Sequence, residues 1–262
     1  MKTALPLPLD IRLMNMAAAL LLSGVVLAGL GAGVLWWLRH PMFAIRAITV
    51  QGEVTRNNAI TLRANVVPQL NGNFFTLNLD QARQVFEAVP WVRVAVVHRD
   101  FPNRLRAQLH EHQPMALWGD DGANTLLNQQ GQVFEANAED PEVEGLPRLK
   151  GPVAQSREVM QMYRYLKPIL LAADMDIERL ELSPRGSWRV ITDKGAQLEL
   201  GRGSQNEVGE QVQMFLRTLS QVTARYGRTP TALAGADLRH KDGYALRLKG
   251  VSTVEADHRK KP

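Results

Sequence analysis

The chain has 262 residues, of which 45% are hydrophobic and 22% are charged, and its formal net charge is +5. Six of its 31 basic residues and one of its 26 acidic residues lie at or beyond the ends of the expected folded part, so 25 of each sign remain there, and no basic stripe is left to bind nucleic acid. The absence of cysteine excludes disulfides, thiolate nucleophiles and cysteine-based metal sites.

Residues 16–38 form an uncharged apolar run that follows a short tail, 1–15, expected to be unstructured. As a helix the run would cover roughly 34 Å, enough to cross a ~30 Å hydrocarbon core. A cleaved signal peptide is the alternative, but its apolar region is typically ~7–15 residues long and ends at small residues. Here the run ends at Trp36-Trp37, so we expect a retained transmembrane helix. Basic residues on its two flanks balance and leave its orientation open.

Residues 43–118 predict a compact α+β unit in the order β-α-α-β-β. Segments rich in β-branched residues predict strands over 43–52, 91–100, 104–112 and 115–118, all in one sheet. The first helix is expected to begin at Asn57 or Asn58 and to end before Pro68. The second is expected to be capped by Asp80, with Ala82, Val85, Phe86 and Val89 on one apolar face.

Residues 119–250 predict a mixed β-sheet domain with helices, and residues 251–262 a disordered tail. The two modules are expected to meet near residues 118–124. The second module begins with a small hairpin over 126–136 and a helix over 157–172 capped by Ser156. Strands over 177–183, 187–192 and 196–200 and a helix over 206–226 follow. Two final strands flank the turn Lys241-Asp242-Gly243.

Several local patterns have a chemical interpretation, but each has a more ordinary one. His110 and His112 share a strand face, yet no third metal ligand is placed by spacing, so we expect no metal site. The segment GRGSQNEVG (201–209) lacks the lysine of a phosphate loop, and a helix cap at Ser204 or Asn206 explains it. Trp91 and Trp118 are expected in the core.

The turn formed by Arg99, Asp100 and Phe101 is the candidate exposed contact of the first unit, although turn chemistry explains it nearly as well. No catalytic or cofactor-binding residue is predicted. A membrane-anchored cell-wall enzyme would need a nucleophile with its base or paired carboxylates, and the chain has no SxxK, GxSxG or HExxH motif. A transport component that binds unfolded substrates would continue into a β-barrel.

The order of the segments resembles one protein family. The stretch FAIRAITVQG is followed by NFFTLNLDQARQVFEAVPWVRVAVVHRDFPNRLRAQLHEHQPMALW, then LLNQQGQVF, LPRLKGP, LELGRG, QMFLRTL and ADLRHKDGYALRL. Together with the preceding apolar run, this series resembles the FtsQ/DivIB family over nearly all of residues 12–250. The resemblance implies a POTRA domain followed by the β domain of that family.

The resemblance also implies a function, as an essential, non-catalytic scaffold of the bacterial division septum. The tail 1–15 would lie in the cytoplasm and residues 39–262 in the periplasm, anchored in the inner-membrane lipid by 16–38 as a type II single-pass protein. The implied partners are FtsB and FtsL, with FtsK, FtsW and FtsI as further division proteins, and the scaffold would help to control septal peptidoglycan synthesis. No cofactor, nucleic acid or small-molecule substrate is implied.

The same resemblance assigns partner binding to the C-terminal strands, where the family receives an extended FtsB segment by strand addition. The matching positions are Arg239, His240, Gly243, Tyr244, Leu246 and Leu248. Arg239 is suited to a partner carboxylate, and the last three of these are expected to offer an alternating apolar row to the added strand. His240 and Leu248 depart from the aromatic residues that the family often has there.

Overall fold

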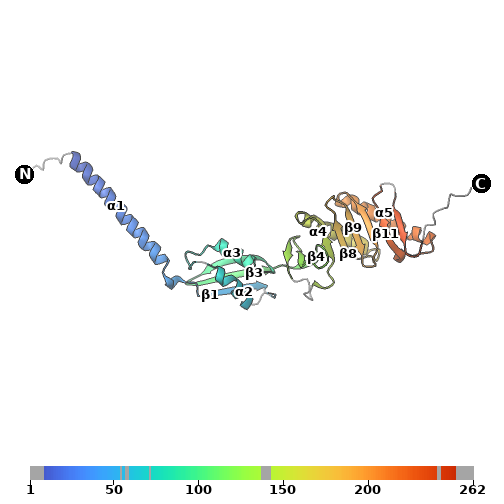
Figure 1. Cartoon of the computed structure of the whole chain (residues 1–262), viewed down its shortest axis with the longest axis horizontal. Helices are drawn as coiled ribbons and strands as arrows, with labels where there is room; N and C mark the ends of the chain where they lie inside the picture. Colours follow the sequence, from blue (N-terminus) through green and yellow to red (C-terminus); the bar gives the residue numbers. More distant parts are fainter. Residues whose placement is uncertain are drawn as a thin grey trace, which may run out of the picture. The chain divides into compact units, whose positions relative to one another are not determined.

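The structure is a computed structural model that describes residues 9–53, 55–56, 59–70, 72–136, 143–240 and 243–251. It divides into two compact units with the boundary between Glu111 and His112 (Figure 1). The described part therefore leaves out Asn57 and Asn58, most of the tail 1–15, the Lys241-Asp242 turn and the tail 252–262, and the predictions on those residues lie outside it.

The first unit contains the long apolar helix and a three-stranded sheet. Its elements are α1 (Leu9–Leu38), β1 (Ala47–Glu53), α2 (Ala59–Val66), α3 (Leu79–Glu87), β2 (Val92–Asp100) and β3 (Arg104–Glu111), with single 3-10 turns at Pro41–Phe43 and Val67–Gln69. The sheet order is β1-β3-β2, with β1 parallel and β2 antiparallel to β3. The predicted order β-α-α-β-β is confirmed.

Two helix starts in this unit differ from the prediction. The helix α1 begins at Leu9, so residues 9–15 are helical rather than unstructured. The acidic Asp10 in its first turn favours this start, because the N-terminal end of a helix carries partial positive charge. The cap of α3 is Asn78, whose side chain accepts from the N–H groups of Asp80 and Gln81 at 2.9 and 3.2 Å. Asp80 lies inside the first turn and is not the cap.

The core of the first unit lies between the helices α2 and α3 and the sheet. Ala82 and Phe86 of α3 pack with Leu105 and Leu109 of β3, all essentially inaccessible to water, so the predicted apolar face is confirmed. Trp91 is only half-buried, and its φ of 71° is unusual for a bulky residue, so its prediction as a core residue is wrong. The carboxylate of Glu111 is buried and accepts hydrogen bonds from the N–H and hydroxyl of Thr55 and from the N–H of Arg56.

The second unit is built on a nine-stranded mixed sheet. Its elements are β4 (Pro114–Trp118), β5 (Thr125–Asn128), β6 (Val133–Glu135), β7 (Arg148–Lys150), α4 (Ser156–Leu171), β8 (Ile177–Leu182), β9 (Trp188–Thr192), β10 (Gln197–Gly201), α5 (Gln205–Arg225), β11 (Leu233–Asp237) and β12 (Ala245–Leu248), with single 3-10 turns at Val153–Gln155 and Pro230–Ala232. The order across the sheet is β12-β11-β10-β9-β8-β7-β4-β5-β6.

The position of β4 corrects the predicted boundary between the modules. Residues 115–118 were expected in the first sheet, but β4 pairs with β5 and β7 of the second. Ala116 and Trp118 are buried in the second core, which confirms Trp118 as a core residue. The strand joins this sheet because its apolar side chains complete that core. The compact first unit therefore ends at Glu111 rather than at residue 118.

The helices α4 and α5 cover one face of the nine-stranded sheet (Figure 1). Ser204 caps α5 in a reciprocal arrangement with Glu207, as predicted. Ser156 is the first residue of α4 and not its cap, because its hydroxyl donates to the carbonyl of Gly131 at 2.7 Å. On β8, β9 and β10 a ladder of ion pairs joins Arg179, Glu181, Arg189 and Glu199.

Candidate partner-binding edge

The strand β12 is a terminal strand of the nine-stranded sheet, and among the described residues it pairs on one side only, with β11. The N–H of Lys249 donates to Ala232 at 2.8 Å, on the β11 side. Main-chain groups of an antiparallel strand alternate in direction, so those of Leu246 point outward. An outward row of N–H and C=O groups is the chemical requirement for pairing with an added strand.

The side chains of this strand point elsewhere than predicted. The ring of Tyr244 meets Phe215 of α5 edge-on at 5.1 Å, and its hydroxyl lies 2.6 Å from the hydroxyl of Thr218. Leu246 packs against the same core, and Leu248 is only 7% exposed. The predicted apolar row therefore holds β12 onto α5 instead of standing open to a partner. The open feature of this edge is its main chain.

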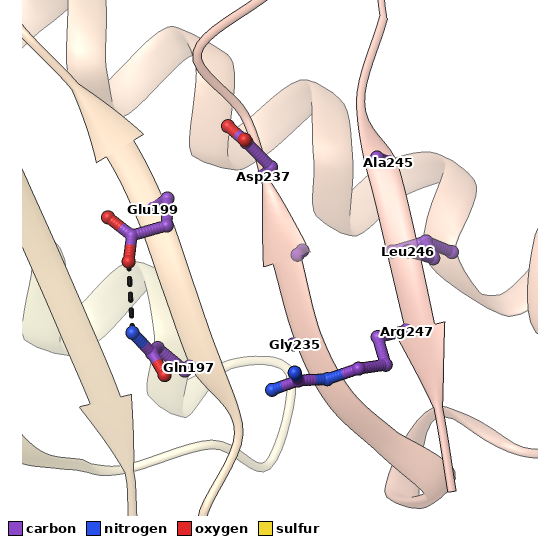
Figure 2. Close-up of a pocket in the computed structure, with 8 residues that line it drawn as sticks. Gln197, Glu199, Gly235, Asp237, Ala245, Leu246 and Arg247 are labelled. Carbon is purple, nitrogen blue, oxygen red and sulfur yellow. Dashed lines mark hydrogen bonds between the residues drawn. The ribbon is translucent and has the colours of Figure 1, made fainter. Parts of the chain in front are cut away.

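The opposite face of β12 carries Ala245 and Arg247, which are exposed. Arg247 reaches across β11 at Gly235 toward Gln197, as Figure 2 shows. A side chain at residue 235 would begin 3.5 Å from the guanidinium and only 3.0 Å from the carbonyl of Gln197, so glycine leaves the passage open. These residues, with Glu199 and Asp237, line a shallow hollow of about 280 Å³ beside the terminal strand.

Arg239 follows β11 and is paired within its own segment. Its Nε and Nη2 atoms donate to the two carboxylate oxygens of Asp237 at 2.8 and 2.5 Å. This guanidinium lowers the pKa of Asp237 to about 2. His240 and Gly243 are exposed on either side of the undescribed residues 241–242. The structure thus brings the six predicted residues to one end of the sheet, with only some of them accessible.

A second hollow, of about 460 Å³, gathers three arginines at the end of β10. Arg185 and Arg202 share its lining with Arg239 and with Gln211 of α5. Gly201 has a φ of +81°, and a Cβ there would lie 3.2 Å from Cγ of Arg239, so glycine permits the close approach. The buried Gln211 Oε1 has no hydrogen-bond partner among the described residues.

No sequence pattern had pointed to Arg185 or Arg202, whereas Arg247 lies within the predicted partner-binding segment 243–248. Arg185 and Arg202 lie in turns, in the segments SPRGS and GRGS, far from β12 in the chain. The sequence signal that could have found them is that each arginine stands beside a glycine just after a predicted strand, and both strands belong to the same sheet. Arg247 alternates with the apolar positions Leu246 and Leu248, so its placement on the outer face followed from the period of a strand.

The candidate turn of the first unit is mostly engaged in internal contacts. Arg99 donates from Nε to the carbonyl of Phe74 at 2.6 Å and from Nη2 to that of Leu77 at 2.7 Å, so it holds a loop. Asp100 pairs with Arg104 and Arg106 at 3.4 Å. Phe101 is 72% exposed. Arg99 and Phe101 are both exposed, but the guanidinium of Arg99 is engaged by backbone carbonyls, whereas the ring of Phe101 offers apolar surface to solvent.

Comparison with known proteins matches both units. The family described as "POTRA domain, FtsQ-type" matches residues 43–112, and "Cell division protein FtsQ/DivIB, C-terminal" matches residues 116–239, ending before β12. The chain is 38% identical over 247 residues to the cell division protein FtsQ of Thiomonas arsenitoxydans, covering 94% of this chain and 90% of that protein. The FtsQ proteins of Burkholderia pseudomallei and Bordetella pertussis are 37% and 35% identical, with coverage between 92% and 96% of each chain.

Proposed function

We propose that this chain, which belongs to the FtsQ/DivIB family of bacterial cell-division proteins, is a non-catalytic scaffold that captures FtsB and FtsL at the division septum. The helix α1 is apolar enough to cross a membrane, with a mean hydropathy of 2.2 over an 18-residue window within Asp10–Leu38. In this proposal residues 1–15 lie in the cytoplasm, residues 16–38 cross the membrane and residues 39–262 lie in the periplasm, in a single-pass inner-membrane protein.

The observation that carries the proposal is the open main-chain edge of β12. A partner segment that pairs with this edge would extend the sheet by one strand, and its own apolar side chains would meet the flank of α5 beside Leu246. Because Tyr244 and Leu248 already hold β12 in place, the edge is ordered before the partner arrives. An ordered edge lowers the conformational entropy that binding would cost.

The three-arginine hollow supports a partner segment that carries a carboxylate. Arg239 pairs with Asp237 in the free chain, and its side chain is still 57% exposed. A partner carboxylate would compete with Asp237 for this guanidinium and would find Arg185 and Arg202 in the same hollow. Charge complementarity of this kind determines the choice and register of the added strand more than the total affinity.

The test is site-specific photo-cross-linking from Ala245 in growing cells. Its side chain is exposed on β12, whereas Tyr244 is engaged with α5. Glu135 is the matched control, because it is exposed on β6, the opposite terminal strand of the same sheet. We expect FtsB to be trapped from residue 245 and not from residue 135. Equal trapping at both positions, or trapping at neither, would refute capture by this edge.

The first unit is proposed to contact division proteins such as FtsK, FtsW and FtsI, and the scaffold as a whole to help control septal peptidoglycan synthesis. Depletion of the protein should then give filaments that grow without dividing, as observed by microscopy; normal septation would contradict the role. No observation among the described residues favours the two alternatives, a cell-wall enzyme or a transport component.

A further inference from the structure

Aromatic side chains form a continuous cluster between the end of α1 and the first sheet. We call it the aromatic collar and define it by Trp37, Phe43, Phe74, Phe75 and Phe101. Successive ring centroids lie 5.1, 4.9, 5.2 and 6.0 Å apart, in the order Trp37–Phe43–Phe75–Phe74–Phe101, and each pair meets edge to face. The collar therefore connects the apolar helix with the loop before α3 and with the β2–β3 turn.

Hydrogen bonds hold the same loop at the C-terminal end of α1. The buried side chain of Asn73 donates from Nδ2 to the carbonyl of Leu38 at 2.5 Å. The last carbonyls of a helix have no partner inside the helix, so Asn73 supplies one. Its Oδ1 accepts from the N–H groups of Phe75 and Thr76 at 3.0 Å. The loop is thereby fixed to the residue at which the apolar run ends.

The collar exposes apolar surface that the fold itself does not cover. Phe101 is 72% exposed, Trp37 52% and Phe75 40%. The carboxylate beside Phe101, that of Asp100, is already paired with Arg104 and Arg106. An exposed aromatic surface with its neighbouring charge neutralised is typical of an interaction site rather than of a solvated turn.

We propose that the aromatic collar lies in the headgroup layer of the membrane that α1 crosses, so that Phe75 and Phe101 seat the first unit on the lipid surface. The inference rests on the proposed membrane insertion of α1. Its occupant is lipid because the collar is continuous with the anchor: Leu38 ends the apolar span, and the headgroup layer beyond it is roughly 5–8 Å deep. Tryptophan and tyrosine are enriched at that depth in membrane proteins, and Trp37 is the member of the collar that belongs to this class.

The physical consequence is a restricted orientation of the first unit. A helix joined to a domain by a free linker leaves the domain able to rotate and tilt above the membrane. Here the bond from Asn73 to Leu38 and the ring contacts leave little of that freedom within the first unit. Lipid contacts at Phe75 and Phe101 would add attachment points away from the helix axis.

The lack of cysteine permits a direct test with single nitroxide labels on the full chain in lipid nanodiscs. The label would be placed by Phe101→Cys, and in separate proteins by Val96→Cys and Leu27→Cys. Val96 is an exposed apolar residue of β2 in the same unit and is the matched control, whereas Leu27 lies inside the apolar run. Collision of each label with oxygen and with a water-soluble nickel complex is measured by power-saturation EPR.

We expect the label at 101 to collide more with oxygen than with the nickel complex, as the label at 27 does, and the label at 96 to show the reverse. If the labels at 101 and 96 are both exposed to water while the label at 27 is in lipid, the collar proposal is overturned. The membrane insertion of α1 would still hold in that case. An aqueous signature at 27 would refute the membrane insertion itself. Protection of residue 101 only after a division protein is added would assign the collar to a protein partner and overturn the lipid proposal.

Discussion

The aromatic collar of the first unit and the β12 edge of the second differ in where their polar groups find partners. At the collar, Asn73 and Arg99 satisfy backbone carbonyls internally, so aromatic rings are what remains exposed. At the β12 edge the apolar side chains are used internally, so main-chain groups and guanidinium groups are what remains. The kind of partner that a surface suits therefore depends on which of its polar and apolar groups already have contacts within the fold.

The largest expected effect comes from placing a charge on the inner face of β12. Leu248→Glu would bury a carboxylate against α5, and we expect the second unit to lose roughly 3 kcal/mol or more of unfolding free energy. Urea unfolding of the full chain in detergent, followed by tryptophan fluorescence, measures it. The control Ala245→Glu on the exposed face should change stability by less than about 0.5 kcal/mol. Equal effects would contradict the assigned faces.

A second prediction tests whether the three-arginine hollow binds a carboxylate of the partner. Arg239→Glu should weaken binding of the periplasmic part of FtsB about 10- to 100-fold, since the hollow would then repel a partner carboxylate. Isothermal titration with the purified chain gives the affinity. Arg217→Glu, an exposed position on α5, makes the same charge change away from the hollow and should leave the affinity nearly unchanged. A similar loss for both variants would show only a general charge effect.

The collar side is tested by removing its central hydrogen-bonding side chain. Asn73→Ala leaves the amides of Phe75 and Thr76 without their acceptor and the Leu38 carbonyl without its donor. We expect local opening to become easier by about 1–3 kcal/mol. Hydrogen exchange of peptides covering residues 73–77 should accelerate accordingly, while Asn103→Ala should leave them unaffected. Unchanged exchange in the first variant would mean that the loop is held by its rings alone.

The smallest expected effect concerns pH. The carboxyl of Asp237 has its pKa lowered from 3.8 to about 2 by Arg239, so its charged form is favoured in the folded chain. The resulting stabilisation is complete above about pH 4 and is lost as the pH falls toward 2. The pair is partly solvated, so its contribution stays below about 1 kcal/mol. Asp237→Asn should therefore be less stable than the parent chain at pH 6 and equal to it near pH 2, as measured by urea unfolding.

Local patterns predicted most of the elements correctly. The apolar stripe of α5, with Val208, Val212, Phe215 and Leu219, is buried as expected, and Ser204 caps that helix. The hairpin of β5 and β6 and the strands β8 to β10 fall within a few residues of their predicted ranges. Helical and strand periodicity depend on neighbours a few residues away, and for that reason the sequence shows them directly.

The errors in tertiary placement have a different cause, because they depend on contacts distant in sequence. Residues 115–118 have an ordinary strand pattern, but their sheet was decided by pairing with β7, about 30 residues later. Ser156 was predicted to cap α4, but its hydroxyl donates a hydrogen bond to the carbonyl of Gly131 instead. Arg99 is exposed as expected, but its guanidinium is engaged by the carbonyls of Phe74 and Leu77, which lie far from it in sequence. No local pattern contains these partners.

The sequence by itself determined the apolar helix and the α+β pattern of the elements, because composition and periodicity are properties of consecutive residues. The order of its segments carried the family resemblance, and that resemblance implied the exposed position of the last strand. Only the tertiary structure decided that Tyr244 and Leu248 face α5, that Arg185, Arg202 and Arg239 share one hollow, and that Asn73 binds the end of α1. The physical reason is that a side chain can meet a partner only where it is not already packed or hydrogen-bonded, and those contacts come from segments distant in sequence.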